Sequence, residues 1–450
     1  MKILWFFTNF NYDKKATYVG CGWVESLLSE LKKHSDTEFA TAFFSDQVKS
    51  LTIHEDEKNK QYVIPSYLNH FDKIKRNILF KDVFFTEREE LILTVIKIFN
   101  PDIIHVFGTE NPFGLLSTKL KIPILIHIQG VINPCLIKWF PAGYSIWDIA
   151  RNTSIKRLFM FSGYWADYFR YIQMGKREIR IFKSVKYFSG RTEWDRQLVG
   201  LLSESANYFH CEEMLRPTFY SKKWNKKRNN DSIQILSIVN PNIYKGLETI
   251  LEAAQLLKLH TSHNFNWIVA GVRSDNVLVK MFSKKTKILP VNVNVSFVGE
   301  MQAVNLLETM MNSDLFIHPS HIDNSPNSIC EAMIIGMPII STHVGGIKSL
   351  ITDNKEGMLV QDGEPFGMAG AINDLICNPL KCELYGEAAR MRAMQRHDPR
   401  TIVKDQYEIY EKILKLNSHE ANPQGIKRAI ANGERRTNKK LEVIHEMKII

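Results

Sequence analysis

The sequence lacks any apolar run long enough to cross a membrane. A transmembrane helix needs about 20 predominantly apolar residues, and no stretch of this chain approaches about 18. The opening segment, MKILWFFTNF, contains an apolar run that is too short for the central region of a signal peptide. We therefore expect a cytoplasmic protein, free or at the inner face of the membrane, whose first residues form a buried strand.

Cysteine is also scarce and scattered. Only two of the six cysteines lie close together in the sequence, and no pair of histidines completes a zinc-binding pattern. We expect reduced cysteines with structural roles, and no metal site. The six are Cys21, Cys135, Cys211, Cys330, Cys377 and Cys382.

The composition is otherwise ordinary for a soluble globular protein, with 44% hydrophobic and 24% charged residues. The net charge of +10 and the pI of about 9.1 favour an anionic partner, such as nucleotide phosphates, a lipid phosphate or a membrane face. The chain has no zinc finger, no RNA-recognition signature and no basic helix joined to heptads. Nucleic acid is therefore not the expected partner.

At 450 residues the chain exceeds the size of one hydrophobic core, which stops growing near about 250–300 residues. Its first half alternates short apolar runs with helical patterns, as a parallel sheet with crossover helices requires. The polar, basic segment 221–232 (SKKWNKKRNNDS) predicts a linker that ends a first domain over residues 1–220. The strands expected there are Ile3–Phe7, Phe39–Phe44, Ile103–Phe107, Ile124–Ile128 and Tyr208–Cys211, and the clearest helices are Gly20–Leu31 and Glu87–Phe99.

Residues 233–398 repeat this alternation, so we expect an α/β fold with two Rossmann-like domains facing each other across a cleft. Apolar residues then recur at amphipathic spacing and predict the helix Thr401–Leu416, within a segment (399–416) that packs back on the N-terminal domain. The basic tail, 417–450, is expected to be poorly ordered. The elements expected in the second domain are strands Ile233–Val239, Asn266–Ala270, Val293–Val298, Asp314–Ile317, Met337–Ser341 and Met358–Val360, and helices Leu247–Leu257, Ala303–Met311 and Gly367–Ile376.

The most informative segment is 317–347, IHPSHIDNSPNSICEAMIIGMPIISTHVGGI. An apolar strand leads into a loop broken by proline, and a helix is expected to start near Asn327 or Ser328. Asp323 lies on the loop, and Glu331 is expected in the first turn of the helix. Ligands bind at the carboxyl ends of strands in open α/β sheets, and amides at a helix start suit a phosphate. The alternative is a surface acid on a loop and a helix acid that stabilises the dipole.

This segment resembles the donor-sugar site of retaining glycosyltransferases of family 4, which have the GT-B fold. Their signature is E-x7-E, followed by A-x-A-x-G-x-P-V-I and a Gly-Gly turn. Here Asp323 replaces the first glutamate, and Lys348-Ser349 stand where the family often has Pro-Glu. The resemblance implies that Glu331 holds the nucleotide ribose and that Asp323 faces the sugar. It also implies that the backbone of the loop meets the sugar and phosphate, at Asn324, Ser325, Pro326, Asn327 and Ser328.

Lys245 lies just after an expected strand, in SIVNPNIYKGLETI. As a point charge it suits a diphosphate leaving group, whereas the alternative is a solvated lysine beside a helix start, where a cation opposes the dipole. The family usually has an arginine five residues earlier, but this chain has Asn240. Arg273, in the strand-end loop IVAGVRSD, is the candidate replacement for that charge.

Glycines also occur where the expected strands end. Gly20 and Gly22 form G-x-G without a third glycine, which disfavours an NAD dehydrogenase. They resemble the N-terminal glycine loop of the same family, which faces the donor phosphates, and a flexible turn is the alternative. Strand-end position adds Gly271, Gly299 and Glu300 to the expected donor-binding residues.

Two histidines at expected strand ends are open to two interpretations. His127 (ILIHIQG) suits either a core position or a contact with the donor sugar or the acceptor, and His105, with Glu110 behind it, is equally ambiguous. His210, Glu212 and Glu213 do not have a metal-ligand spacing, and we interpret them as a strand-to-helix loop. The candidate catalytic residues are Asp323, Glu331, Lys245 and His127.

The segment Lys138–Gly190 combines aromatic residues with ten Lys or Arg against three Asp or Glu. Such a stretch suits a membrane interface or a lipid-phosphate acceptor, and the alternative is a packed helical face with solvated charges. GRTEWDR (Gly190–Arg196), which follows it, resembles a motif frequent in bacterial members of the family.

The resemblance implies transfer of a sugar from a UDP- or GDP-linked donor to a saccharide or lipid-linked acceptor, with retention, in bacterial surface polysaccharide or glycolipid synthesis. It implies no metal and no cofactor. A nucleotide-sugar 2-epimerase of the same fold and a non-catalytic basic binding protein are the alternatives.

Overall fold

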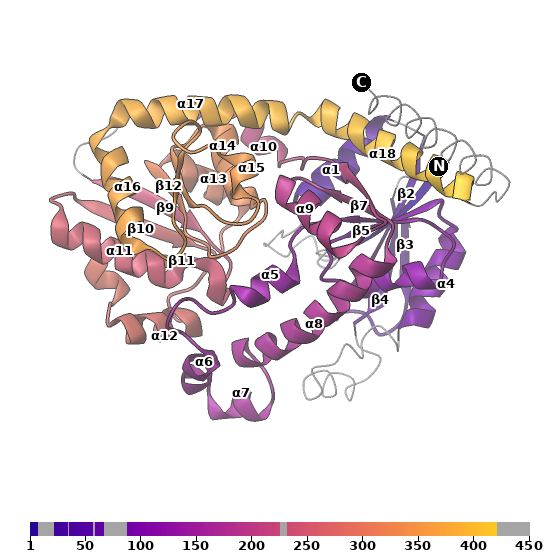
Figure 1. The fold of residues 1–450 in the computed structure, drawn as a ribbon, viewed down its shortest axis with the longest axis horizontal. Coiled ribbons are helices and arrows are strands. Elements are labelled where there is room, and N and C mark those ends of the chain that lie inside the picture. The colour runs from indigo at the N-terminus through magenta and orange to yellow at the C-terminus, as the bar shows by residue number, and fades with distance from the viewer. Residues whose placement is uncertain (8–21, 35, 57–58, 67–87, 226–231, 421–450) are drawn as a thin grey trace, which may run out of the picture.

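The computed structural model describes residues 1–7, 22–34, 36–56, 59–66, 88–225 and 232–420 (Figure 1). They form two α/β domains, each built on a parallel sheet. Alternate residues of a strand enter different cores: Leu4 and Phe6 pack on one side of the first sheet, and Ile3 and Trp5 on the other. Both faces of the sheet are therefore buried at its centre, which explains why β1, β5 and β6 are nearly continuous apolar runs.

Over the described residues, the N-terminal sheet has eight strands in the order β3-β4-β2-β1-β5-β6-β7-β8, of which only β3 runs antiparallel, against β4. Its order places the carboxyl ends of β5, β6 and β7 next to one another, facing the other domain. The strands are β1 (Lys2–Phe6), β2 (Glu38–Ser45), β3 (Thr52–Asp56), β4 (Asn59–Pro65), β5 (Ile103–Phe107), β6 (Ile124–His127), β7 (Tyr187–Gly190) and β8 (Asn207–His210).

The C-terminal sheet has six parallel strands in the order β11-β10-β9-β12-β13-β14. The chain order reverses between β9 and β12, and such a switch point is where open sheets bind ligands. The strands are β9 (Ile233–Ile238), β10 (Phe265–Ala270), β11 (Val295–Gly299), β12 (Leu315–His318), β13 (Ile339–Thr342) and β14 (Met358–Val360).

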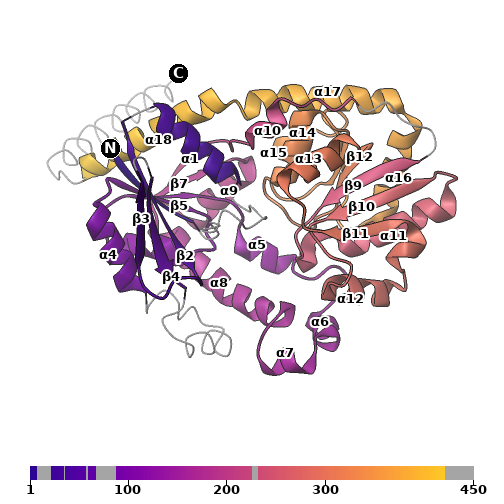
Figure 2. The same ribbon diagram turned by 180° about the vertical axis from the view of Figure 1, so that it is seen from behind.

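Helices cover both sheets, as seen from the two sides in Figures 1 and 2. Among the described helices, none has both the length and the apolar character to cross a bilayer. Those that precede β9 are α1 (Gly22–His34), α4 (Glu89–Phe99), α5 (Ile132–Ile137), α6 (Ile146–Asn152), α7 (Ile155–Phe159), α8 (Tyr164–Ser184), α9 (Glu193–Leu202), α10 (Pro217–Tyr220) and the 3-10 helix η1 (Pro112–Thr118). Those that follow β9 are α11 (Leu247–His260), α12 (Val277–Thr286), α13 (Ala303–Met311), α14 (Asn327–Ile335), α15 (Ile347–Leu350), α16 (Pro365–Cys377), α17 (Pro379–Arg396), α18 (Pro399–Glu420) and the 3-10 helices η2 (Ile243–Lys245) and η3 (Pro290–Val293).

The elements expected from the sequence are present within a few residues of their predicted bounds. The described part of the chain has further elements that the sequence analysis did not predict: strands β3, β4 and β7, the helices α5 to α10, α12, α15 and α17, and the 3-10 helices η1 to η3. The predicted Gly20 lies outside the described residues, as do residues 226–231 of the linker and residues 421–450 of the tail. Residues 417–420, expected in the tail, continue α18.

The segment between α5 and α8 crosses from the N-terminal domain to the C-terminal one. Trp139 and Ile149 pack in the core of the C-terminal domain, and the Tyr144 ring lies 5.0 Å from that of Phe282 on α12. Lys285 Nζ is 2.9 Å from Asp148 Oδ1. These contacts attach α6 to α12, so the aromatic residues of this segment are partly core residues.

The C-terminal helices make the reverse crossing. α17 runs along the C-terminal domain and α18 continues over the N-terminal domain, as both views show (Figures 1 and 2). Ile402, Tyr410 and Ile413 pack with β1 and α1. The Tyr410 hydroxyl accepts from Trp5 Nε1 at 3.1 Å and lies 2.7 Å from His105 Nδ1. Burial lowers the pKa of His105 to about 3, so its ring is neutral.

Tyr410→Phe removes that hydroxyl and leaves two buried ring nitrogens without their partner. We expect the free energy of unfolding to fall by about 1–3 kcal/mol. Tyr407→Phe, which removes one half-buried hydrogen bond to the Leu31 carbonyl, is the matched control and should cost less. Equal losses in urea unfolding would contradict the anchoring role of Tyr410.

Candidate functional site

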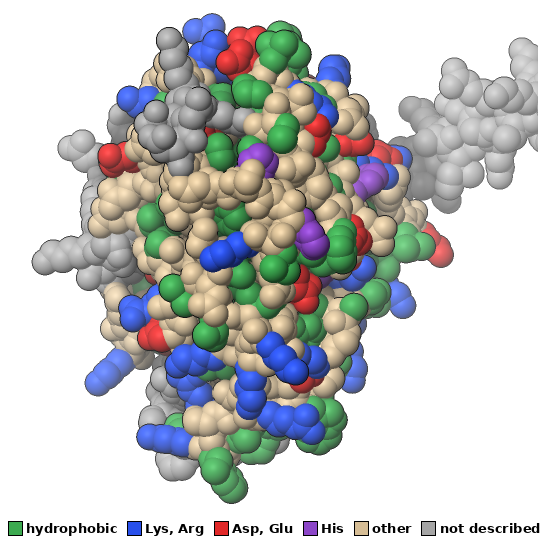
Figure 3. All heavy atoms as spheres, turned by 90° about the vertical axis from the view of Figure 1, so that its left-hand side faces the viewer, with side chains coloured by type: hydrophobic (Ala, Val, Ile, Leu, Met, Phe, Trp, Pro, Cys, Tyr) green, Lys and Arg blue, Asp and Glu red, His purple; other side chains and the backbone are tan. Residues whose placement is uncertain are grey.

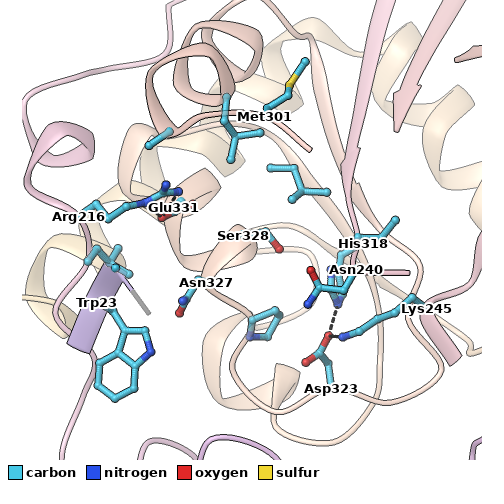
Figure 4. Close-up of a pocket in the computed structure, with 17 residues that line it drawn as sticks. Trp23, Arg216, Asn240, Lys245, Met301, His318, Asp323, Asn327, Ser328 and Glu331 are labelled. Atoms are coloured by element: carbon cyan, nitrogen blue, oxygen red, sulfur yellow. Dashed lines mark hydrogen bonds and ion pairs between the residues drawn. The ribbon is translucent and has the colours of Figure 1, made fainter. Parts of the chain in front are cut away.

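A cavity of about 280 Å³ lies between the two domains, at the switch point of the C-terminal sheet (Figure 4). Most of its wall comes from the C-terminal domain, and α1 and the segment before α10 close it from the other side. Its lining residues are Gly22, Trp23, Leu215, Arg216, Ile238, Val239, Asn240, Lys245, Met301, Ala303, Leu306, His318, Asp323, Pro326, Asn327, Ser328 and Glu331.

One end of the cavity is polar and charged. Lys245 Nζ lies 2.5 Å from Asp323 Oδ2, and His318 Nε2 lies 3.0 Å from the same oxygen. Burial alone would raise the pKa of Asp323, but the Lys245 ammonium and the His318 ring outweigh it and hold the pKa well below the ordinary value. Asp323 is therefore ionised at neutral pH, and it orients Lys245 toward the cavity.

Lys245 is placed by the turn that follows it. It ends η2, and Gly246 then adopts a left-handed conformation with a φ of 73°. A Cβ at Gly246 would come within 2.1 Å of the Pro319 carbonyl oxygen. Only glycine allows this approach, which brings Lys245 against the β12–α14 loop (residues 319–326) and its Asp323.

Glu331 does not lie in the first turn of its helix, as the sequence suggested. α14 begins at Asn327, so Glu331 lies one turn further along. Its side chain still reaches the cavity because side chains on a helix lean toward the N-terminus. Asn327 and Ser328, at the helix start, lie between Glu331 and the Lys245–Asp323 pair in Figure 4.

Arg216 is a cavity residue that the sequence analysis missed. Its Nε donates to Glu331 Oε1 at 2.7 Å, and the two charged groups form an ion pair at 2.6 Å. Burial raises the pKa of Glu331, and the charge of Arg216 opposes this effect. Arg216 comes 115 residues before its partner. No local sequence motif predicts a pair of residues so far apart in the sequence.

The opposite wall of the cavity is apolar. It is formed by Ile238, Met301, Ala303 and Leu306, from the end of β9 and the start of α13. The cavity therefore offers an apolar surface at one end and a lysine, a carboxylate and a helix start at the other. This arrangement suits an elongated ligand with a flat ring at one end and an anionic group near the other.

Several residues predicted for the site lie elsewhere. His127 is buried, with Nδ1 3.0 Å from Ser189 Oγ, and does not line the cavity, although its ring is 5.3 Å from that of Trp23. Arg273 is exposed and pairs with Asp275, so it does not replace the missing family arginine. Glu300 is exposed as well. Gly271 and Gly299 close the ends of their strands through a 2.7 Å backbone hydrogen bond and do not line the cavity.

The side chains of Asn324 and Ser325, also predicted to bind the ligand, are directed toward the N-terminal domain. Asn324 contacts Thr192 and Asp195, and Ser325 contacts Glu213. Within the described part of the chain, no group of three or more His, Cys, Asp or Glu is arranged to hold a metal ion.

His321, on the same loop, is enclosed by charged groups from three elements. Its Nε2 lies 2.6 Å from Glu248 Oε1, and its Nδ1 lies 2.5 Å from Asp362 Oδ1. Lys138, from the N-terminal domain, also pairs with Asp362, at 2.7 Å. Burial alone would lower the pKa of His321, but the two carboxylates outweigh it and raise the pKa to about 9.

Comparison with known proteins shows that the C-terminal domain is similar to glycosyltransferases. Residues 220–392, less than half of the 450-residue chain, match the family model of glycosyl transferases group 1. An uncharacterized glycosyltransferase of Methanocaldococcus jannaschii is 23% identical over 190 residues, which cover 42% of this chain and 47% of that protein. A GDP-mannose-dependent alpha-mannosyltransferase of Mycolicibacterium smegmatis is 30% identical over 117 residues, covering 26% and 30% of the two chains. The chain thus spans about half the length, or less, of these relatives.

Solved structures show the fold of most of the chain. Sucrose-phosphate synthase from Thermosynechococcus elongatus superposes with a TM-score of 0.69 at 13% identity, covering 92% of this chain and 100% of its own. Anabaena HepE in complex with UDP and glucose superposes with a TM-score of 0.60 at 15% identity, covering 91% and 98%. The predicted fold class is confirmed: the chain has the two-domain GT-B fold of glycosyltransferases.

The histidine with the raised pKa gives a testable pH dependence. A raised pKa stabilises the folded state fully below the unfolded pKa of about 6.5, and this contribution is lost as the pH rises through about 9. At pH 6 we expect His321→Gln to lower the free energy of unfolding by about 1–3 kcal/mol, and we expect this difference to shrink by pH 10. His260→Gln, at an exposed position, is the control. A difference independent of pH would contradict the arrangement.

Proposed function

We propose that the protein is a retaining glycosyltransferase that moves a sugar from a nucleotide-diphosphate sugar to an acceptor hydroxyl. One observation carries the proposal: the Lys245 ammonium and the start of α14 line the same cavity, at the switch point of a parallel sheet. The match of residues 220–392 to glycosyl transferases group 1 and the GT-B fold support it.

The two ends of the cavity suggest how the donor lies. The apolar wall of Ile238, Met301 and Leu306 suits the base, and Glu331 accepts hydrogen bonds from the ribose hydroxyls. The diphosphate then lies at Asn327, Ser328 and Lys245. Asp323, with two carboxylate oxygens, accepts from the sugar hydroxyls.

In this arrangement the leaving diphosphate gains negative charge where positive charge is already placed. Lys245 and the amides at the start of α14 stabilise that charge, which lowers the barrier to cleavage of the sugar–phosphate bond. We propose that the acceptor attacks from the face that the phosphate leaves. The two described carboxylates of the cavity, Asp323 and Glu331, are both held in ion pairs, which disfavours a covalent sugar intermediate on either.

We propose a saccharide or lipid-linked acceptor at the inner face of the membrane, in polysaccharide or glycolipid synthesis. The surface of α6 and α7 supports it: Trp147 and Phe159 are 69% and 80% exposed, beside exposed Arg151, Lys156 and Arg157. Lys280 and Lys284 of the neighbouring α12 are also exposed, and Figure 3 shows Lys and Arg gathered toward the lower end of this face. Apolar side chains among basic ones suit an anionic bilayer surface.

The transfer reaction is tested with two cavity variants. Lys245→Ala should lower kcat by about 100-fold with less change in donor binding, because its charge acts on the departing diphosphate. Glu331→Ala should weaken donor binding by about 10- to 100-fold, because a charged hydrogen bond is lost. Arg273→Ala and Glu300→Ala, which remove charges outside the cavity, are the matched controls.

The assay follows release of nucleotide from UDP- and GDP-sugars with and without acceptor, and unfolding of each variant is measured in parallel. Release that depends on an acceptor supports a transferase. Interconversion of nucleotide sugars without acceptor would indicate the epimerase instead. Full turnover by folded Lys245→Ala would contradict its role.

Membrane association is tested by flotation with vesicles. We expect binding to anionic vesicles at low salt and loss of binding at high salt, since each basic residue near an anionic leaflet contributes about 1 kcal/mol. The double variant Trp147→Ala/Phe159→Ala should bind less. Phe366→Ala, at an exposed aromatic residue on α16, is the control. Absence of binding to anionic vesicles at low salt would favour a soluble acceptor.

A further inference from the structure

The Gly190–Arg196 motif meets the β12–α14 loop across the domain boundary. Thr192 is the N-cap of α9, and Asp195 is the third residue of that helix. Asn324 lies opposite them, next to the cavity residue Asp323. All three of these contacting side chains are buried, at 3% exposure or less. The start of α9 is therefore packed directly against the loop that carries part of the donor site.

The start of α9 binds both polar atoms of the Asn324 carboxamide. Thr192 Oγ1 donates to Asn324 Oδ1 at 2.7 Å, and Asn324 Nδ2 donates to Asp195 Oδ1 at 2.8 Å. Nδ2 also donates to the Gln129 carbonyl at 3.1 Å. Because one side accepts and the other donates, the pocket selects an amide over a carboxylate or an apolar side chain.

The helix cap leaves these atoms available. Asp195 uses its other oxygen, Oδ2, to accept from the backbone amides of Arg191 and Thr192, at 2.9 and 3.1 Å. Thr192 Oγ1 accepts from the Asp195 amide at 3.1 Å, so its hydroxyl proton is directed to Asn324. The bonds of the capping box thus fix the Thr192 and Asp195 side chains without involving the loop.

A second contact reinforces the first. Ser325 Oγ donates to Glu213 Oε2 at 3.1 Å, and Glu213 is held by a buried ion pair with Arg191. Arg191 Nη2 in turn donates to the Gln129 carbonyl at 2.8 Å. Two consecutive loop residues are therefore fixed by the N-terminal domain.

Gly346 packs closely against the loop and against Thr192. Its amide donates to the Asp323 carbonyl at 3.1 Å. A Cβ at Gly346 would lie 2.4 Å from the Asn324 carbonyl oxygen and 2.8 Å from Thr192 Cγ2. Only glycine leaves room for the loop and the cap to meet here. The Gly-Gly turn that the sequence analysis singled out therefore packs the loop against α9.

We propose that Thr192 and Asp195 are positioning residues, which hold the β12–α14 loop in its donor-binding form by binding the Asn324 carboxamide. Asn324 lies between Asp323 and the start of α14, so fixing its side chain fixes both parts of the donor site. This proposal rests on the proposed transferase function. If the two residues have this role, the donor site is complete only while the two domains are in contact.

A reciprocal exchange tests this role. Asn324→Asp sets a carboxylate against Asp195 and the Gln129 carbonyl, and Asp195→Asn sets two amide donors against each other. We expect each single variant to raise the KM for the nucleotide sugar by about 10-fold or more, with the acceptor KM unchanged. In the double variant the amide introduced at position 195 donates to the carboxylate introduced at position 324, so its KM should be about 10-fold lower than the product of the single effects predicts. We expect the KM to recover only in part, because the Gln129 carbonyl oxygen then faces a carboxylate oxygen at position 324.

Ser349→Ala is the matched control. It removes a 3.1 Å hydrogen bond from the Glu193 amide across the same boundary without touching the loop, and its donor KM should stay near that of the wild type. Single variants with a donor KM within twofold of the wild type would overturn the proposal. A double variant whose donor KM shows no recovery would also overturn it. So would single variants whose loss of activity is explained entirely by their fraction of unfolded protein.

A readout without catalysis separates this proposal from the proposed function. Amide hydrogen exchange of residues 320–325 should be at least about 10-fold faster in both single variants and slower again in the double variant, while α4 is unchanged. If the wild type transfers no sugar, the proposed function fails and this measurement alone decides the positioning role. Unchanged exchange in the loop would overturn it.

Discussion

Asn324 and Ser325 are buried at the boundary of the two domains. The side-chain partners of Asn324 belong to the N-terminal domain, and Ser325 Oγ bonds to Glu213 of that domain and also lies 3.7 Å from Cys330 Sγ of α14. Because a buried polar group without a partner costs about 1–3 kcal/mol, the contact with the N-terminal domain provides partners that these buried side chains require. Much of the architecture maintains that contact. The segment between α5 and α8 enters the C-terminal core, and α18 returns to the N-terminal sheet.

The same loop carries the electrostatics of the cavity. Asp323 holds Lys245, and His321 binds Glu248 and Asp362, which in turn binds Lys138 of the other domain. These ion pairs fix the charged side chains of the loop and of its neighbours. For the transfer that we propose, charges fixed in this way would need little reorganisation.

The sequence predicted what depends on local pattern. Periodicity and turn residues gave both domains, and the strand–loop–helix pattern around Asp323 gave the cavity, with Lys245 and Glu331 on its wall. The missed strands are β3, β4 and β7, and the missed α-helices are α5 to α10, α12, α15 and α17. Many of them are short, or pack partly on the other domain, as α6 does on α12. The predicted start of α14 was right, but the position of Glu331 within it was wrong by one turn.

The sequence could not show pairings that tertiary structure creates. Arg216 reaches Glu331, and Thr192 reaches Asn324, across more than a hundred residues. The sequence supported His127 equally as a core residue and as a site residue. In the structure its side chain is buried and does not line the cavity, as expected for a core residue. Arg273 lies at a strand end, as ligand-binding residues do, yet its side chain extends into solvent and pairs with Asp275.

Crystal structures of the chain with UDP and, separately, with GDP test the central claim most directly. The diphosphate should lie within hydrogen-bond distance of Lys245 Nζ and the amides of Asn327 and Ser328, with the Asn324 carboxamide still bound to Thr192 and Asp195. A nucleotide bound outside this cavity, or an Asn324 side chain that leaves α9 to bind the nucleotide, would contradict the account.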